Sequence, residues 1–270
     1  MLEHAVQKVL QRLRKNPPTV FPLIPYPLLG FMSGSHSNSA KPILYLLLQV
    51  TLLVLAIEIV VFRLWAIDLG SSFPLNGDGL WFAVPVKSMI DNGWVYDIPQ
   101  LSAPFGLSAA GFPSMTNFDW LLMKLVSVFT SNAAAVLHIY WLLSIVLTSW
   151  SAVVALHLLG ARNWLALGAA LVYAFLPYAF LRHVHHISLV YYTVPLLALL
   201  AIFIAKGGEH PKAKLVRWFG YGASVAQGFN YIYFSFFALL LFSFAAILGV
   251  VQNKSRRPIR EAAAAMLIIL

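Results

Sequence analysis

Five long apolar runs dominate this sequence and limit what it can fold into. They span about residues 43–67, 133–159, 164–181, 187–205 and 218–251. A helix of about 20 apolar residues is long enough to cross the roughly 30 Å hydrocarbon core of a bilayer. Hydrophobic residues make up 60% of the chain, more than one soluble core can bury. We therefore expect an all-α fold, a polytopic transmembrane helical bundle.

The last run, residues 218–251, is too long for a single crossing. At about 1.5 Å per residue it would extend for about 50 Å. We expect a hairpin of two short helices that breaks near Gly228, Phe229 and Asn230. The sequence ends a few residues into another apolar segment, at residues 266–270, so the runs predict six complete spans and a severed seventh. We therefore expect a chain truncated at its C-terminus, the N-terminal portion of a larger protein.

Lysine and arginine residues predict the topology. If the N-terminus is inside, 14 of the 18 basic residues fall in inner segments, as the positive-inside rule requires. A single crossing of residues 218–251 would place the basic cluster at 254–260 outside, so the count also favours the hairpin. The net charge of +9 then indicates contact with anionic lipid. No nucleic-acid motif accompanies these residues, and we expect no nucleic-acid partner.

The N-terminal segment 1–42 is expected to lie on the cytoplasmic side. Residues 1–15 have the pattern of an amphipathic helix lying flat on a membrane, and residues 16–42 form a linker rich in Pro, Ser and Gly. The membrane module then occupies residues 43–270.

The first outer loop, residues 68–132, is the polar centre of the chain. It holds every aspartate of the sequence, although charged residues make up only 10% of the chain. A short apolar segment from Leu80 to Ile90 predicts a helix lying at the membrane surface, and a second helix is expected to open near Asp119. We expect short interfacial helices within this loop and a water-facing site carried by it.

Asp78, in the sequence Asn-Gly-Asp-Gly, has two interpretations. It is either the N-cap of the Leu80–Ile90 helix, or an exposed carboxylate that acts as a general base or binds a hard metal ion. Asp119 likewise either stabilises the start of its helix by interacting with the helix dipole, or takes part in catalysis. Asp91 and Asp97 are expected to be solvated.

The segment Arg182–His186 is the densest basic cluster predicted outside. On a helix, Arg182 and His186 lie one turn apart, as do His183 and His186, so a cation and an imidazole would meet one phosphate. Lys87 is a further candidate phosphate ligand. The alternative is that these side chains extend to the membrane interface for solvation.

Glu58 lies near the middle of the first span, where an acid is costly and marks a candidate functional residue. Its expected partners are Arg63 or His138. This group would serve as an internal relay if the protein is a transporter or flippase. Structural pairing of polar groups is the other interpretation.

In order along the chain, the loop and the later spans carry short elements that resemble the GT-C superfamily of polytopic glycosyltransferases. The resemblance covers about residues 43 to 250. The elements are Asn76-Gly77-Asp78, Pro104-Phe105-Gly106, Asp119, Leu176-Pro177-Tyr178, Arg182, His186 and Pro195.

The resemblance implies a bacterial inner-membrane enzyme that moves a sugar from a polyprenyl-phosphate donor to an acceptor on the outer face. Asp78 would be its base or metal ligand, with Mg²⁺ or Mn²⁺ as the possible cofactor, and Asp119 a second catalytic candidate. Arg182 and His186 would hold the lipid phosphate. Some members have two adjacent acids where this chain has one, so metal dependence stays open. Asn230, at the hairpin tip, would line the cavity that such a site needs at headgroup depth.

Overall fold

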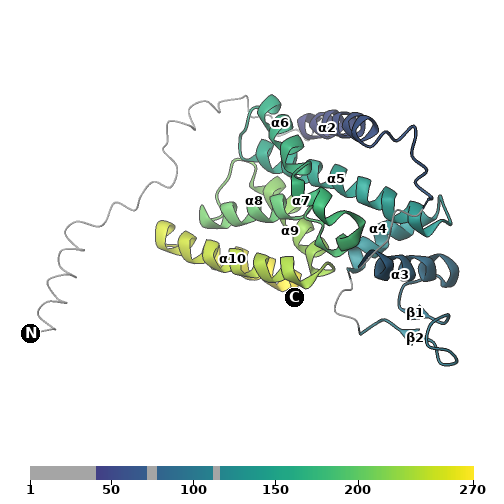
Figure 1. Cartoon of the computed structure of the whole chain (residues 1–270). Helices are drawn as coiled ribbons and strands as arrows, with labels where there is room; N and C mark the ends of the chain where they lie inside the picture. The colour runs from purple at the N-terminus through teal and green to yellow at the C-terminus, as the bar shows by residue number, and fades with distance from the viewer. Residues whose placement is uncertain (1–40, 72–77, 112–115) are drawn as a thin grey trace, which may run out of the picture. The chain divides into compact units, whose positions relative to one another are not determined.

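The computed structural model of the protein describes residues 41–71, 78–111 and 116–270, and these ranges are mostly helical, with only two short strands. The predicted all-α fold is confirmed, whereas the amphipathic helix predicted for residues 1–15 lies outside the described residues. The elements, labelled in Figure 1 where there is room, are α2 (Lys41–Val61), α3 (Asp78–Asn92), β1 (Asp97–Ile98), β2 (Leu107–Ser108), α4 (Asn117–Ser127), α5 (Ala133–Leu158), α6 (Asn163–Ala174), α7 (Pro177–Arg182), the 3₁₀ helix η3 (His183–Leu189), α8 (Val194–Ala205), α9 (Ala213–Gly228), α10 (Ile232–Asn253) and α11 (Arg257–Ile269).

Five helical segments within the described residues are long and apolar enough to cross a membrane, which makes the chain a multi-pass membrane protein, as predicted. The number is one fewer than the six complete spans expected, because α9 has only 16 residues. The first crossing ends at Val61 instead of Ile67, because the backbone turns there and Arg63 has a φ of 50°. The five segments are Lys41–Val61, Ala133–Leu158, Asn163–Arg182, His185–Ala205 and Ile232–Asn253.

The predicted hairpin in residues 218–251 is confirmed. Helix α9 ends at Gly228 and α10 begins at Ile232, so the break falls at Phe229, Asn230 and Tyr231. Only α9 is short, with 16 residues, whereas α10 has 22 and is long enough to cross by itself. The expectation of two short helices is therefore wrong for the second one.

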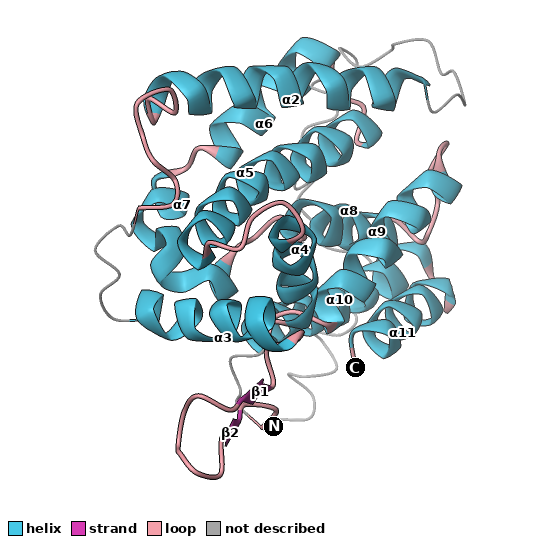
Figure 2. Ribbon diagram, turned by 90° about the vertical axis from the view of Figure 1, so that its right-hand side faces the viewer, coloured by secondary structure: helices cyan, strands magenta, loops and turns pink. Residues whose placement is uncertain are grey.

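Helix α5 forms the centre of the bundle. In its most apolar stretch 67% of the residues are buried, against 28% in α2 and 22% in α10, which leaves most of the surface of those two helices for lipid. It packs against α2 and α6, and also against α4 and α8 (Figure 2). Trp150 donates its indole N–H to the Thr51 hydroxyl at 2.7 Å, which ties α5 to α2.

The segment 68–132 carries two short helices, α3 and α4, as predicted. Between them lies an antiparallel ribbon that the sequence did not indicate, in which Asp97 pairs with Ser108 and Ile98 with Leu107. Phe105, in the connection between the two strands, is 95% exposed. The α9–α10 turn lies at the same end of the bundle, because the Phe118 amide donates to the Phe229 carbonyl at 3.2 Å. We call this end the loop end.

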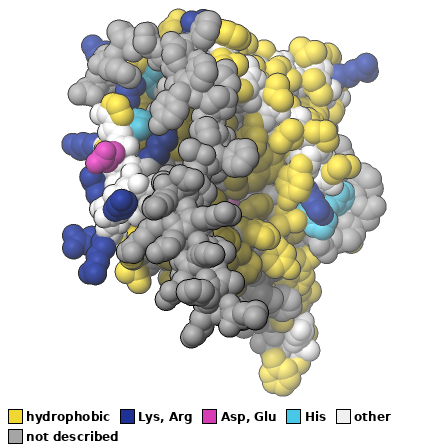
Figure 3. Space-filling model, turned by 90° about the vertical axis from the view of Figure 1, so that its left-hand side faces the viewer, with side chains coloured by type: hydrophobic (Ala, Val, Ile, Leu, Met, Phe, Trp, Pro, Cys, Tyr) yellow, Lys and Arg dark blue, Asp and Glu magenta, His cyan; other side chains and the backbone are white. Residues whose placement is uncertain are grey.

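The connections that carry the predicted inner charges also come together, at what we call the basic end. Lys212, before α9, lies 3.3 Å from the His157 ring near the end of α5. Asn253, at the end of α10, donates to the Ala205 carbonyl at the end of α8 at 3.3 Å. Figure 3 shows many of the visible Lys and Arg side chains along one edge of the molecule, beside a broad hydrophobic surface. Of the segments grouped by the charge count, those after α5, after α8 and after α10 thus share one end within the described residues.

Candidate functional site

A buried aspartate lies at the centre of the loop end. Asp119, in the first turn of α4, has a fully buried side chain. The Tyr192 hydroxyl donates to Asp119 Oδ1 at 2.5 Å, and the Asn230 side-chain amide donates to the Tyr192 oxygen at 2.9 Å. Two of the predicted site residues, Asp119 and Asn230, are therefore brought together, and Tyr192 joins them.

Local hydrogen bonds hold the three segments of this cluster in place. The contact between Phe118 and Phe229 fixes the start of α4 against the α9–α10 turn. The Thr193 hydroxyl donates to Gln227 Oε1 at 2.6 Å, which ties the residue after Tyr192 to the last turn of α9. Each segment is therefore anchored within two or three residues of the side chain that it contributes.

Two further hydroxyl groups, those of Thr116 and Tyr140, face the same carboxyl group. Together with Asn230 they lie close enough to Asp119 to act on its protonation. Four buried oxygens, however, have no hydrogen-bond partner within the described residues: Asp119 Oδ2, Thr116 Oγ1, Tyr140 OH and Asn230 Oδ1. The cluster therefore contains more hydrogen-bonding capacity than it uses.

Burial raises the pKa of Asp119 to about 6, because a low-dielectric surrounding penalises the charged form. The hydrogen bond from Tyr192, and the groups of Tyr140, Thr116 and Asn230, oppose this rise in pKa. In the described part of the chain no salt bridge reaches Asp119. The carboxylate is thus stabilised by dipoles and not by a neighbouring charge.

An apolar cavity of about 250 Å³ lies beside this cluster. Tyr192 connects the two, since its ring lines the cavity while its hydroxyl binds Asp119. Asp119 itself does not line the cavity. The other lining residues come from α2, α4, α5, α8, α9 and the segment before α8, and include Leu47, Phe118, Trp150, Leu196 and Phe219.

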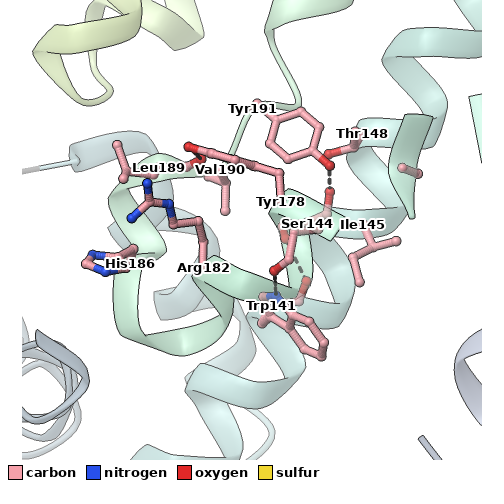
Figure 4. A pocket seen from close by; sticks show the side chains of 12 residues that line it. Trp141, Ser144, Ile145, Thr148, Tyr178, Arg182, His186, Leu189, Val190 and Tyr191 are labelled. Carbon is pink, nitrogen blue, oxygen red and sulfur yellow. Dashed lines mark hydrogen bonds between the residues drawn. The ribbon is translucent and has the colours of Figure 1, made fainter. Parts of the chain in front are cut away.

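Arg182 and His186 line a second, smaller cavity of about 20 Å³, which has room for about one water molecule (Figure 4). The Arg182 guanidinium carbon lies 5.5 Å from the centre of the Tyr178 ring, a cation–π arrangement. The helical spacing assumed for Arg182 and His186 is wrong, because the chain is a 3₁₀ helix there and kinks at His186 (φ −137°, ψ 56°). The two side chains nevertheless share one cavity. The His183 side chain lies outside the described residues.

The other loop residues fall into two groups. Asp78 opens α3, as predicted, and its side chain lies outside the described residues. Lys87, predicted to bind phosphate, forms an exposed ion pair with Asp91 at 2.7 Å, one turn along α3. Asp91 and Asp97 are exposed, which confirms the expectation that they are solvated.

Glu58 lies in the last turn of α2 and not near the middle of the span as expected, because the helix ends at Val61. It is buried, and its Oε1 has no hydrogen-bond partner within the described residues. Arg63 is exposed and makes no ion pair with it. His138 Nδ1 lies 2.9 Å from the Leu69 carbonyl. Because Thr51 pairs with Trp150 and Phe62 packs on Trp141, Glu58 lies about level with residues 143–145. Neither expected partner is therefore brought to Glu58.

Among the described residues no three His, Asp or Glu side chains form a group that could hold a metal ion. The Asp78 carboxylate, the predicted metal ligand, is not among the side chains described. Comparison with protein-family models, with curated proteins and with solved structures finds no match to this chain. The functional assignment therefore depends on the residues and their arrangement.

Three members of the Asp119 cluster were not predicted: Thr116, Tyr140 and Tyr192. Tyr140 and Tyr192 lie within or next to apolar runs, where a tyrosine is usually a packing residue. Thr116 precedes α4 and has the residue type of a helix N-cap, although its side chain makes no capping bond. The only signal in the sequence was the polar sequence Tyr191-Tyr192-Thr193 between two apolar segments.

Proposed function

We propose that the protein is a membrane glycosyltransferase that moves a sugar from a polyprenyl-phosphate donor to an acceptor at the membrane surface. One observation carries the proposal: helix α3, which Asp78 opens, packs against η3, which follows Arg182 and contains His186. Sugar transfer needs a base for the acceptor hydroxyl and a cation for the phosphate leaving group. The candidate base, Asp78, and the candidate cation, Arg182, belong to adjoining parts of the structure, α3 and the segment at η3.

In the proposed reaction the acceptor hydroxyl gives its proton to the Asp78 carboxylate. The acceptor oxygen forms a bond to the anomeric carbon of the sugar, and the bond from that carbon to the phosphate oxygen breaks. Arg182 stabilises the departing polyprenyl phosphate, with His186 beside it. Because their shared cavity holds about one water, the phosphate would bind at its rim, where Arg182 is exposed.

The surrounding structure suits a lipid-linked donor. The apolar cavity offers part of the polyprenyl chain a place among the helices, and Tyr192 forms part of its wall. Asp119 is fully buried and lines neither cavity, so we give it a positioning role: it holds the Tyr192 hydroxyl. A divalent cation, Mg²⁺ or Mn²⁺, enters the proposal only through Asp78, and we derive no step from it.

The same proposal includes an orientation. The basic end carries most of the Lys and Arg residues, so it would face the cytoplasm together with the N-terminus, and the loop end would face outward. The protein would then be a multi-pass protein of a bacterial inner membrane, with membrane lipid and the lipid-linked donor as its partners.

The test compares Asp78→Asn with Asp78→Ala in membranes that contain the protein at matched expression, supplied with a panel of polyprenyl-phosphate sugars. An N-cap tolerates Asn but loses on the order of 1 kcal/mol with Ala. A base tolerates neither, because an amide does not accept a proton near neutral pH. We expect both variants to lose transfer, while Asp91→Asn, a change at an exposed position, keeps it. Full transfer by Asp78→Asn would remove Asp78 from the reaction.

One observation favours a second function, that of a transporter or flippase. Glu58 is a buried acid within a membrane-spanning helix, and Oε1 of its carboxyl group has no hydrogen-bond partner within the described residues. Intramembrane acids of this kind commonly relay protons or ions. Glu58 belongs neither to the Asp119 cluster nor to the Asp78 and Arg182 elements, so its removal separates the two functions.

A further inference from the structure

Four oxygens from three parts of the chain, the start of α4, helix α5 and the α9–α10 turn, have no hydrogen-bond partner around the Asp119 carboxyl group. They are Asp119 Oδ2, Thr116 Oγ1, Tyr140 OH and Asn230 Oδ1, and each is buried without a hydrogen-bond partner in the part of the chain that the structure describes. Thr116, Tyr140 and Asn230 all lie within reach of this one carboxyl group and lower its pKa, but none of them makes a hydrogen bond of good geometry with it. The unused oxygens therefore belong to a single site.

Leaving these buried oxygens without a partner is energetically unfavourable. A buried polar atom without a partner costs about 1–3 kcal/mol, and native proteins satisfy nearly all of them. The Tyr192 hydroxyl proton is already used, because it bonds Asp119 Oδ1. A species that accepts lone pairs from several oxygens at once would satisfy the remaining atoms.

The charges around the site favour a cation. The carboxylate is the only formal charge in the cluster, and no salt bridge balances it among the described residues. Helix α9 ends at Gly228, immediately before the turn that holds Asn230, and the C-terminal end of a helix dipole attracts positive charge. The ligand set consists of a carboxylate, an amide oxygen and two hydroxyls, which are hard oxygen ligands.

We propose that Asp119, Thr116, Tyr140 and Asn230 form a binding site for a monovalent alkali cation, with Na⁺ as the probe. One bound positive charge neutralises the single carboxylate, whereas a divalent ion would leave an excess charge in a buried site. Asn230 is only half-buried and gives the ion a route from the surface at the hairpin tip. The site uses neither Asp78 nor Arg182, but it shares Asp119 with the positioning of Tyr192 proposed above.

In this arrangement the cation has a structural consequence for the loop end. It would join α4, α5 and the α9–α10 turn through their side chains, and the Asp119 carboxylate would hold Tyr192 at the wall of the apolar cavity at the same time. Occupancy of the site should therefore stabilise the folded protein and raise its Tm, since a ligand that binds only the folded state shifts the unfolding equilibrium.

The experiment measures the Tm of the purified protein in detergent at about pH 8, where the carboxylate is ionised, in NaCl, KCl or choline chloride of equal ionic strength. We expect a saturable increase in Tm with Na⁺ or K⁺ relative to choline. Asp119→Asn keeps the shape but removes the charge, and should abolish the increase. Asp97→Asn, at an exposed position, is the matched control and should retain it.

A second variant keeps the test decisive if Asp119→Asn does not fold. Thr116→Val removes one oxygen from the site, preserves the charge, and should move the midpoint of the Na⁺ titration to higher concentration. Equal Tm values in the three salts for the unaltered protein would mean that the site holds only water, and would overturn the proposal. An undiminished ion effect in both Asp119→Asn and Thr116→Val would place the ion elsewhere and refute it equally.

Discussion

Replacing Asp119 by asparagine is expected to remove part of the pH dependence of the protein's stability. Burial raises the pKa of Asp119 from 3.8 to about 6 in the folded state. A carboxyl group with a raised pKa favours the folded state while it is protonated. Its contribution is complete below about pH 4 and is lost as the pH rises through about 6. A shift of roughly two pKa units corresponds to about 3 kcal/mol.

The measurement is the difference in Tm between Asp119→Asn and the unaltered protein, taken from about pH 4 to about pH 7 in choline buffers that contain no alkali cation. Other titrating groups act equally on both proteins, so the difference isolates Asp119. The Tm of the variant should increase relative to the Tm of the unaltered protein as the pH rises, because the variant has no buried carboxylate to desolvate. A difference that stays constant across this range, or that falls, would refute the assignment of a buried, raised-pKa carboxyl group.

Three further predictions follow from other parts of the molecule. A cysteine at Ser102 should react with an impermeant thiol reagent from outside intact cells and one at Lys254 should not; the reverse pattern would invert the proposed orientation. Gly249→Ala should destabilise the protein by about 1–3 kcal/mol, because the added Cβ would lie 2.6 Å from the Ile204 carbonyl oxygen. Its control is Gly222→Ala, whose added Cβ would have no atom within 4 Å, and which should leave the Tm unchanged or slightly higher. Glu58→Gln should leave sugar transfer largely intact; abolished activity at normal expression, with a loss that depends on pH, would favour transport.

Local patterns in the sequence determined the helical framework. The apolar runs predicted the membrane helices to within a few residues at most ends, because the length of an apolar segment is set by the thickness of the bilayer. The break at Phe229–Tyr231 was predictable because α9 and α10 together are too long for one crossing. The ends of helices were less predictable: the apolar sequence continues to Ile67, whereas α2 stops at Val61.

The candidate site depended on tertiary structure. Asp119 and Tyr192 are 73 residues apart and Tyr192 and Asn230 are 38 apart, and no periodic pattern relates them. From sequence, an aspartate in the first turn of a helix indicates an exposed residue that stabilises the helix dipole. Packing of α4 against α5 and the α9–α10 turn buries it instead, and burial is what raises its pKa and leaves oxygens around it without partners. Local sequence sets the type and length of each helix, but the helix packing determines which polar side chains share a buried, low-dielectric site.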